Sequence, residues 1–248
     1  MRSYQWFSIN DNSTAYTCSK RYHNDIFASF AGSQPHFSKC GYIGIITDLG
    51  SHTGKLFQEN LRIYDDTAAN DARFIREQVQ PGDICIDATM GNGNDTLLLS
   101  SLCGKDGHVF AFDIQEAALI NTRKRLMEAD APQNYTLLLE SHTNIEHYVD
   151  PGTVSCITFN LGYLPGGDHT KATHADTSIV ALSKSLDLLQ KGGLISLCIY
   201  SGGDSGFEER NAVLAWLKEL NPHKYLVIRS DYYNRPNNPP IPVLIIRQ

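Results

Sequence analysis

A short run of glycines and carboxylates is the part of the chain best suited to binding a small ligand. From residue 87 it reads Asp-Ala-Thr-Met-Gly-Asn-Gly-Asn-Asp-Thr, directly after the apolar residues Ile84–Ile86. Gly91 and Gly93 lack a Cβ, so backbone N–H groups and the start of a following helix can come close to a ligand. Asp87 and Asp95 add two negative charges, which favour a cationic ligand over an anionic one.

The same run argues against a dinucleotide. A dinucleotide-binding loop has the spacing G-x-G-x-x-G, but Thr96 stands where the third glycine is expected. The pyrophosphate of a dinucleotide would also face Asp87 and Asp95, whereas S-adenosylmethionine has no phosphate and carries an ammonium and a sulfonium group. We therefore predict S-adenosylmethionine as the cofactor. The expected contacts in this loop are Asp87, Thr89, Gly91, Gly93, Asn94, Asp95 and Thr96.

Later strand ends are expected to complete the cofactor site. Asp113 ends an apolar, strand-like run 22 residues after Gly91, the distance at which a carboxylate can accept hydrogen bonds from both ribose hydroxyls. Ile114 follows it and is included among the expected contacts. His142 follows a third strand-like run and lies where an adenine could be contacted, with an ordinary surface histidine as the alternative. The Asp113 signal is shared by NAD enzymes and does not by itself select the cofactor.

The sequence Asn-Leu-Gly-Tyr from residue 160 could hold the group that receives a methyl. The side-chain oxygen of Asn160 and the backbone carbonyl of Leu161 can accept hydrogen bonds from an amine. Tyr163 can lie flat against a planar base, and Asn160 is also expected to contact the cofactor. Transfer of an activated methyl group needs mainly alignment, so we expect neither a metal nor a covalent nucleophile. Asp168 could assist the loss of a proton from the acceptor, as could the nearby histidines, but no general base is assigned.

These motifs need a sheet to bring them together. From about residue 67 onwards, strand patterns alternate with helix patterns, which predicts an α/β fold whose parallel sheet is covered on both faces. The last two strands have a short connection and should form an antiparallel hairpin. The expected strands are 84–88, 108–113, 135–139, 154–160, 194–200, 224–230 and 242–246, and the expected helices are 68–79, one after the glycine loop, 115–129, 176–190 and 207–220. Gly192 and Gly193 are expected to end the helix at 176–190.

The composition limits the partners and the location. The formal net charge is −6, which argues against a broad electrostatic grip on nucleic acid, because phosphate contacts normally come with a basic face. No apolar run reaches the roughly 20 residues that a membrane helix needs, so we expect no membrane partner and a cytoplasmic location. The six cysteines form no C-x-x-C pair, so neither a zinc site nor a disulfide framework is expected.

The beginning of the chain differs in character from the rest. Residues 1–60 hold ten of the chain's 24 aromatic residues and show no clear helical or strand period. We expect residues 1–66 to be an N-terminal extension of unknown role and residues 67–248 to be the domain that carries the motifs. The extension could be an RNA-binding addition, an organellar leader or an arm that packs on a second subunit in a homodimer.

The motifs resemble those of the rRNA-methylase-like family that includes the tRNA 5-(aminomethyl)-2-thiouridine methyltransferases. The resemblance covers about residues 67–248, and its specific part is Asn-Leu-Gly-Tyr-Leu-Pro-Gly-Gly-Asp at 160–168. It implies a Rossmann-like class I methyltransferase with a seven-stranded, mostly parallel sheet. It also implies N-methylation of the aminomethyl group on a tRNA wobble uridine, with the anticodon region as partner. The chain departs from the family at Tyr200-Ser201-Gly202, where a Tyr-Gly-His-type loop is usual.

Other functions fit parts of the same pattern. Within the same chemistry the substrate could be rRNA or a small amine, and a different class would be a regulatory module that binds S-adenosylmethionine without turnover. An NAD oxidoreductase is a further alternative. Asp87 and the absent third glycine count against NAD, and the intact loop from Asn160 to Asp168 counts against a module without activity.

Overall fold

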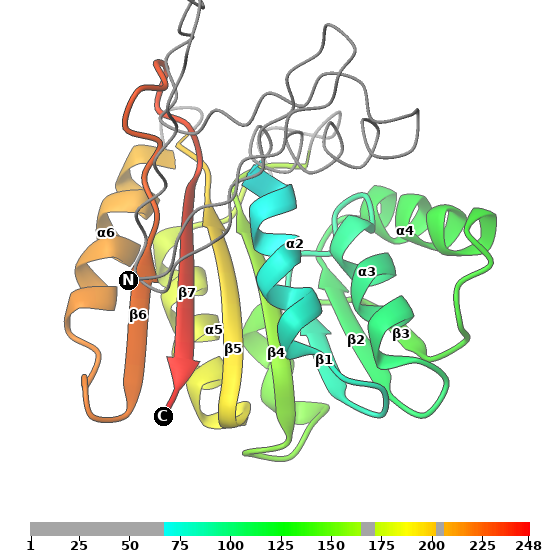
Figure 1. The fold of residues 1–248 in the computed structure, drawn as a ribbon. Coiled ribbons are helices and arrows are strands. Elements are labelled where there is room, and N and C mark those ends of the chain that lie inside the picture. Colours follow the sequence, from blue (N-terminus) through cyan, green and yellow to red (C-terminus); the bar gives the residue numbers. More distant parts are fainter. Residues whose placement is uncertain (1–66, 165–171, 202–205) are drawn as a thin grey trace, which may run out of the picture. The chain divides into compact units, whose positions relative to one another are not determined.

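The computed structural model describes residues 67–164, 172–201 and 206–248. The expected extension, residues 1–66, lies outside this part of the chain. Within it, strands and helices alternate along the sequence and build one seven-stranded sheet with helices on both faces (Figure 1). The predicted α/β fold is confirmed.

The described elements have the following bounds. The strands are β1 (Ile84–Asp87), β2 (His108–Asp113), β3 (Tyr135–Leu139), β4 (Val154–Leu161), β5 (Leu189–Ile199), β6 (Tyr225–Arg229) and β7 (Ile241–Arg247). The helices are α2 (Thr67–Gln78), α3 (Asn94–Cys103), α4 (Glu116–Glu128), the 3-10 helix η1 (His142–His147), α5 (Ala175–Leu188) and α6 (Gly206–Lys218).

The strand order places the expected ligand site. The sheet runs β3-β2-β1-β4-β5-β7-β6, with β1 to β5 parallel to one another and β7 antiparallel to both β5 and β6. The order reverses between β1 and β4, which are hydrogen-bonded neighbours although β2 and β3 separate them in the sequence. A crevice at the carboxyl ends of the strands beside such a reversal is where open α/β sheets bind ligands.

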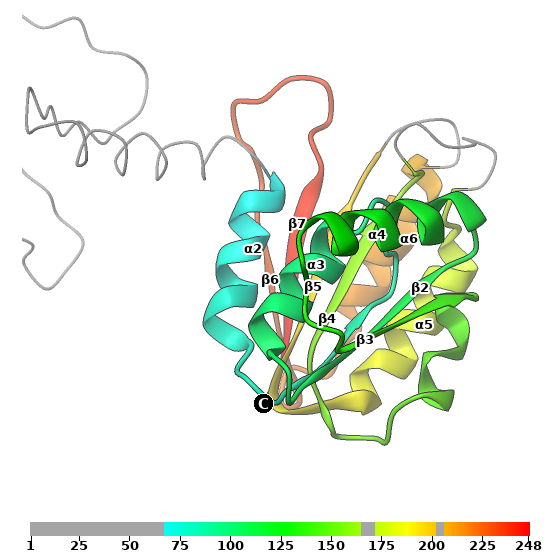
Figure 2. The same cartoon turned by 90° about the vertical axis from the view of Figure 1, so that its right-hand side faces the viewer.

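Both faces of the sheet are buried. Helices α5 and α6 and the 3-10 helix η1 cover one face, and α2, α3 and α4 cover the other (Figures 1 and 2). Along β4, Ile157 and Phe159 join the core on the α5 side and Cys156 joins the core on the α3 side. The only residue of β4 that is not buried is Asn160, at the end of the strand that reaches the ligand site.

One predicted boundary is wrong. Helix α5 ends at Leu188 and β5 begins at Leu189, so Gly192 and Gly193 do not stop the helix. Leu189 is fully buried in the core, and with φ −59° and ψ 136° its backbone has already left the helical conformation. The left-handed Gly192, with φ 80°, belongs instead to an irregularity of the sheet in which Val154 pairs with Leu189 and Cys156 pairs with Leu194.

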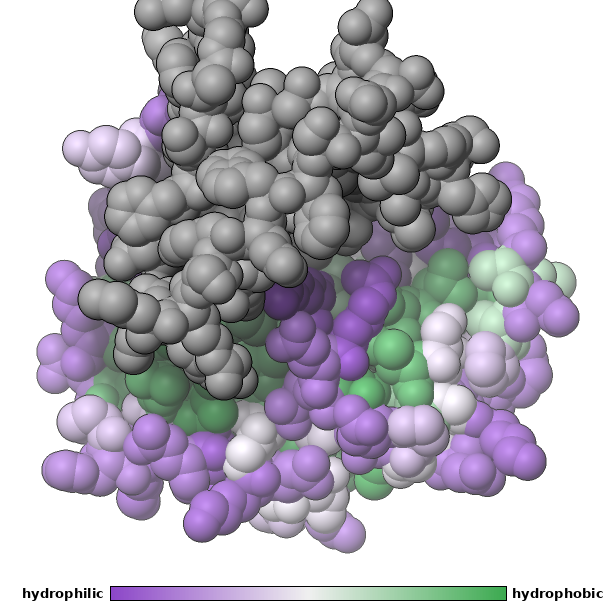
Figure 3. Space-filling view, viewed as in Figure 1, coloured by the Kyte–Doolittle hydropathy of each residue, from purple (hydrophilic) through white to green (hydrophobic). Residues whose placement is uncertain are grey.

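The remaining predicted strands and helices lie within two residues of their expected bounds, and the C-terminal antiparallel hairpin is confirmed. The 3-10 helix η1 was not predicted. Among the described residues, no helix combines the length and the apolar character needed to cross a bilayer. In the part of Figure 3 that is not grey, hydrophilic residues predominate, with smaller apolar areas between them.

Candidate active site

A cavity of about 200 Å³ opens at the carboxyl ends of β1, β2, β3 and β4. Seven of the predicted site residues line it: Thr89, Gly91, Asp113, Ile114, His142, Asn160 and Tyr163. The sheet therefore brings together residues from four separate strand ends, as the positions of the motifs predict. The cavity is also lined by residues that the sequence did not single out as ligand contacts, among them Gln115, Glu140, Ser141, Thr173 and Thr177.

The glycine turn joins β1 to α3. Gly91 and Gly93 have φ angles of 49° and 77°, in the left-handed region that favours glycine. A Cβ at Gly93 would lie only 2.9 Å from atoms of Thr122 on α4. Gly93 therefore allows α4 to approach the turn, whereas Gly91 lines the cavity. Asn94 is exposed at the start of α3 and does not line the cavity.

Two carboxyl groups lie behind the turn. Asp87 is fully buried and accepts hydrogen bonds from Thr96 Oγ1 at 2.6 Å and from the backbone N–H of Thr89 at 3.3 Å. Burial, and then the charge of Asp95, raise the pKa of Asp87 to about 7. Burial also raises the pKa of Asp95. None of Asp87, Asp95 and Thr96 lines the cavity, so in the structure they support the turn.

Asp113 connects the end of β2 to the turn. Its Oδ2 accepts a hydrogen bond from the backbone N–H of Gly91 at 3.1 Å, and its Oδ1 accepts one from the N–H of Gln115 at 2.9 Å. Burial raises the pKa of Asp113. Each carboxylate oxygen can accept more than one hydrogen bond, so Asp113 can hold the turn and still accept from hydroxyl groups in the cavity.

Asn160 is held in one orientation. Its side-chain nitrogen donates to Asp95 Oδ2 at 2.7 Å, and its backbone N–H donates to Thr89 Oγ1 at 2.7 Å. Because the nitrogen is engaged by a carboxyl group, the amide oxygen is the atom that can accept a hydrogen bond from a ligand. Asn160 thus offers a hydrogen-bond acceptor at the cavity. Its bond to Asp95 determines that this acceptor is the amide oxygen.

The other predicted catalytic residues are placed differently. Tyr163 lines the cavity and is 42% exposed. Leu161 does not line it, and its carbonyl oxygen accepts the backbone N–H of Tyr200 at 3.0 Å. A carbonyl oxygen has a second lone pair, so the acceptor role of Leu161 stays a prediction. Asp168 lies outside the described residues.

His142 lines the cavity and has a buried ring nitrogen without a partner in the described part of the chain. Its Nε2 atom is buried and has no hydrogen-bond partner among the described residues. Burial lowers the pKa of His142, which a hydrogen bond to the backbone of Ala88 partly offsets. The neutral ring is therefore favoured near pH 7, and a buried nitrogen without a partner is costly unless a ligand or water engages it.

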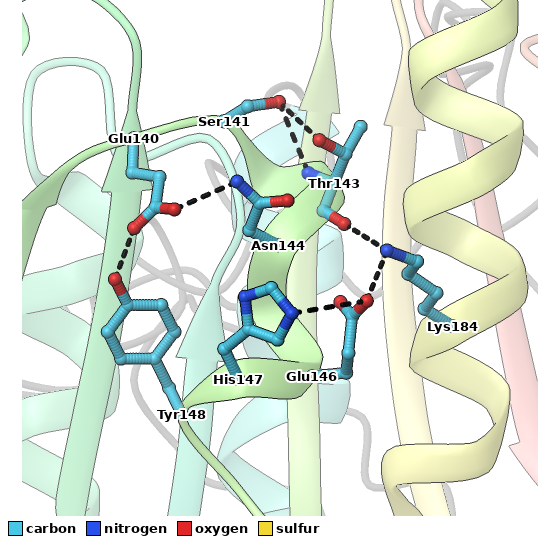
Figure 4. A network of polar contacts seen from close by, with 8 residues as sticks. All are labelled: Glu140, Ser141, Thr143, Asn144, Glu146, His147, Tyr148 and Lys184. Carbon is cyan, nitrogen blue, oxygen red and sulfur yellow. Dashed lines mark hydrogen bonds and ion pairs between the residues drawn. The ribbon is translucent and has the colours of Figure 1, made fainter.

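A polar network holds the third strand end (Figure 4). Glu140 accepts hydrogen bonds from Asn144 Nδ2 at 2.8 Å and from the hydroxyl of Tyr148. Lys184 of α5 donates to the backbone carbonyl of Thr143 and pairs with Glu146, which ties η1 to α5. The sequence showed an acidic residue at this strand end, but only the packing of η1 shows that Glu140 faces the cavity.

A comparison of the whole chain with known proteins identifies the family. A sequence profile of the family described as "Putative rRNA methylase" matches residues 109–246, more than half of the 248 residues. The chain belongs to this family. A relative of the methyltransferase, the chloroplastic tRNA (mnm(5)s(2)U34)-methyltransferase of Arabidopsis thaliana, is 36% identical over 187 residues. That alignment covers 71% of this chain and 68% of the relative.

Solved structures agree with this placement. A crystal structure from Clostridium thermocellum, described in the same words as the family, is 45% identical with a TM-score of 0.72. The match covers 74% of the methyltransferase and 98% of that chain. A "putative methyltransferase" from Streptococcus mutans, solved in complex with SAH, is 36% identical with a TM-score of 0.67 and the same two coverages. The chain is therefore an enzyme of an RNA-modifying methyltransferase family, and S-adenosylmethionine is its cofactor.

The cavity fits this cofactor. Among the described residues that line it, none is Lys or Arg, and Asp113 and Glu140 contribute carboxyl groups. Such a lining suits a ligand with positive charge and without phosphate. Gly91 lines the cavity with a left-handed backbone, and His142, which also lines it, has a buried Nε2 without a partner among the described residues. The methyltransferase thus has the acceptors that ribose hydroxyls and an adenine amino group require.

Proposed function

We propose that the methyltransferase N-methylates the aminomethyl group on the wobble uridine of certain tRNAs, converting 5-aminomethyl-(2-thio)uridine to 5-methylaminomethyl-(2-thio)uridine. The observation that carries this proposal is the orientation of Asn160. Asp95 holds its amide nitrogen, so its oxygen is the acceptor at the cavity. An amine offers an N–H to that oxygen. The Arabidopsis thaliana relative is named for position U34 of tRNA, which supports tRNA over rRNA.

The residues of the chain bind and align the two substrates. S-adenosylmethionine, when bound, supplies a methyl group on a positively charged sulfur atom. Asp113 accepts the ribose hydroxyls and His142 contacts the adenine, while Asn160 directs the lone pair of the amine towards the methyl group. Tyr163 packs against the pyrimidine ring, and its exposed position at the cavity supports this role. Alignment of this kind can supply a large part of the rate enhancement.

An aminomethyl group must lose a proton before its nitrogen can react. Asp168 follows Asn160–Tyr163, the acceptor loop, in the sequence. We keep it with Asn160, Leu161 and Tyr163 in the proposed catalytic set. Its placement lies outside the described residues.

The decisive experiment is methyl transfer to RNA. Labelled S-adenosylmethionine is incubated with the methyltransferase and bulk tRNA from cells that lack wobble methylation, and the nucleosides are then separated by mass spectrometry. We expect label in a methylaminomethyl uridine. rRNA from the same cells and free methylamine serve as parallel acceptors. Label in either of these, with none in tRNA, would favour the rRNA or small-amine alternative.

Two further proposals concern the chain outside the described domain. We infer that residues 1–66 form a separate extension to the methyltransferase domain at 67–248, whether as an RNA-binding addition, a leader or an arm in a homodimer. We also propose that the enzyme acts in the cytoplasm, or in an organelle if residues 1–66 are a leader. The relative from Arabidopsis thaliana is named as chloroplastic, which supports the second compartment.

A further inference from the structure

A buried carboxylate on α6 is the feature that the proposed mechanism does not use. Glu209 is only 2% exposed. Its Oε2 accepts a hydrogen bond from Thr173 Oγ1 at 2.7 Å, and its Oε1 accepts one from Ser178 Oγ at 2.6 Å. Burying a carboxylate is costly unless hydrogen bonds compensate it. Two short hydrogen bonds from hydroxyl groups compensate the burial of Glu209, and their donors lie in different parts of the molecule.

The Thr173 branch leads to the acceptor loop. The backbone N–H of Gly162 donates to Thr173 Oγ1 at 2.8 Å, and the backbone N–H of Thr173 donates to the carbonyl of Gly162 at 2.9 Å. A hydroxyl has one proton to donate. Glu209 Oε2 at 2.7 Å is a much closer acceptor for that proton than the carbonyl oxygen of Gly162 at 3.4 Å. A lone pair of Thr173 Oγ1 is therefore directed at the N–H of Gly162.

Gly162 has little freedom to move elsewhere. It lies two residues after Asn160 and one before Tyr163, the two proposed contacts of the acceptor base. A Cβ at this position would lie 3.1 Å from the Cβ of Tyr200, so the loop already runs close to the end of β5. Gly162 is thus held between Tyr200 on one side and Thr173 on the other.

The Ser178 branch leads away from the cavity. Ser178 is fully buried in α5 and does not line the cavity. Its bond to Glu209 joins α5 to α6 and does not involve the acceptor loop. The same carboxylate therefore makes one contact with the loop and one contact that only joins two helices, which allows a matched control.

We propose that Glu209 is a positioning residue for methyl transfer. It orients the hydroxyl of Thr173, which in turn fixes Gly162 and so sets the place of Asn160 and Tyr163 relative to the cofactor. The inference rests on the proposed acceptor site, and no contact between Glu209 and either substrate is required. Its consequence is that α6, on the far side of α5 from the cofactor strands, determines the turnover number rather than cofactor affinity.

The test uses the full chain with four variants. Thr173→Val removes the hydroxyl at nearly constant volume, and Thr173→Ser keeps it. Glu209→Met keeps the side-chain length without a carboxylate. Ser178→Ala removes the other partner of the same carboxylate. Three quantities are measured for each: exchange of the Gly162 amide proton, S-adenosylhomocysteine affinity, and kcat for tRNA methylation.

We expect Thr173→Val and Glu209→Met to speed exchange at Gly162 and to lower kcat about tenfold or more, since small misplacements of reacting groups have effects of this size. Affinity for S-adenosylhomocysteine should change less than about threefold. Thr173→Ser should restore most of kcat, and Ser178→Ala should change neither kcat nor exchange at Gly162. A double variant of Glu209 and Thr173 should be no worse than either single one, because both act through one hydroxyl.

Several results would overturn the inference. An equal loss of kcat in Ser178→Ala would show that Glu209 only joins α5 to α6. The inference would also fail if the Gly162 amide proton exchanged as slowly in Glu209→Met as in the wild type. If Glu209→Met does not fold, the comparison of Thr173→Val with Thr173→Ser decides whether the Thr173 hydroxyl positions Gly162. If wild-type enzyme does not methylate tRNA, the proposed function fails, but exchange at Gly162 still tests the inference.

Discussion

Asn160 lines the cavity and is also hydrogen-bonded to residues that support it. Its amide nitrogen is bound by Asp95 and its backbone N–H by Thr89, so three segments of the chain meet at one residue. We therefore include Asp95 in the proposed functional unit, although it does not line the cavity. Asp95 holds the amide nitrogen, and we propose that the amide oxygen accepts a hydrogen bond from the methyl acceptor.

We predict that Asn160→Ala removes turnover and spares cofactor binding. The alanine removes the acceptor oxygen but leaves Gly91 and Asp113 in place, so kcat should fall at least about a hundredfold. Calorimetry with S-adenosylhomocysteine and a methyl-transfer assay measure the two effects. Normal turnover in this variant would contradict the mechanism.

Replacing Asp113 should weaken cofactor binding, which Asn160→Ala is expected to spare. Hydrogen bonds to charged groups contribute about 1.5–3 kcal/mol each, so Asp113→Ala should weaken S-adenosylhomocysteine binding at least about tenfold. Asp113→Asn is the matched control, because it keeps an oxygen for one of the two backbone N–H donors from Gly91 and Gln115. Its affinity should lie between those of the wild type and Asp113→Ala, as isothermal titration calorimetry can measure.

Asp87 should make stability depend on pH. Its pKa is raised from 3.8 to about 7 in the folded protein, so the folded state binds the proton more tightly than the unfolded state. The free energy of unfolding should therefore fall as pH rises from about 4 to about 7, and level off above that range. Asp87→Asn should flatten this part of the profile, as urea unfolding at several pH values can show. An unchanged slope in the variant would assign the pH dependence to other groups, such as Asp95.

At the scale of elements, the turn between β1 and α3 depends on two different properties of glycine. Gly91 lines the cavity, and a Cβ there would make only an ordinary contact with Leu164 at 3.5 Å, so its left-handed backbone is what favours glycine. Gly93 instead allows α4 to approach the turn. Both have left-handed backbones. The spacing of the two glycines in the sequence predicts a tight turn, but it does not reveal that one of them serves packing rather than ligand binding.

Gly93→Ala should destabilise the domain. A left-handed alanine costs roughly 1–2 kcal/mol, and overpacking adds about 1–3 kcal/mol, because the new Cβ would lie 2.9 Å from Thr122. Gly152→Ala is the control, since Gly152 has a similar φ of 75° but no atom within 4 Å of the added Cβ. The difference between the two variants in urea unfolding measures the packing effect alone. Equal losses of stability would show that backbone strain accounts for both.

At the scale of the whole molecule, the proposed ribose and adenine contacts, Asp113 and His142, both lie in the described domain. We predict that a chain of residues 67–248 binds S-adenosylhomocysteine within about threefold of the full-length affinity, as calorimetry can measure. A much weaker affinity would show that residues 1–66 contribute to the cofactor site. Preserved cofactor affinity with lost tRNA binding would assign the extension to RNA recognition.

The sequence alone determined the fold class, the cofactor and the positions of the strand ends that meet at the cavity. These follow from local patterns: apolar periods, a glycine turn, and a polar residue where each strand ends. Only the tertiary structure decided which of these residues line the cavity. It places Asp87 and Asp95 behind the turn, brings Glu140 to the cavity, and links Thr173 to Glu209 across 36 residues of sequence. Local patterns report backbone conformation over a few residues, whereas hydrogen bonds between separate elements depend on how those elements pack.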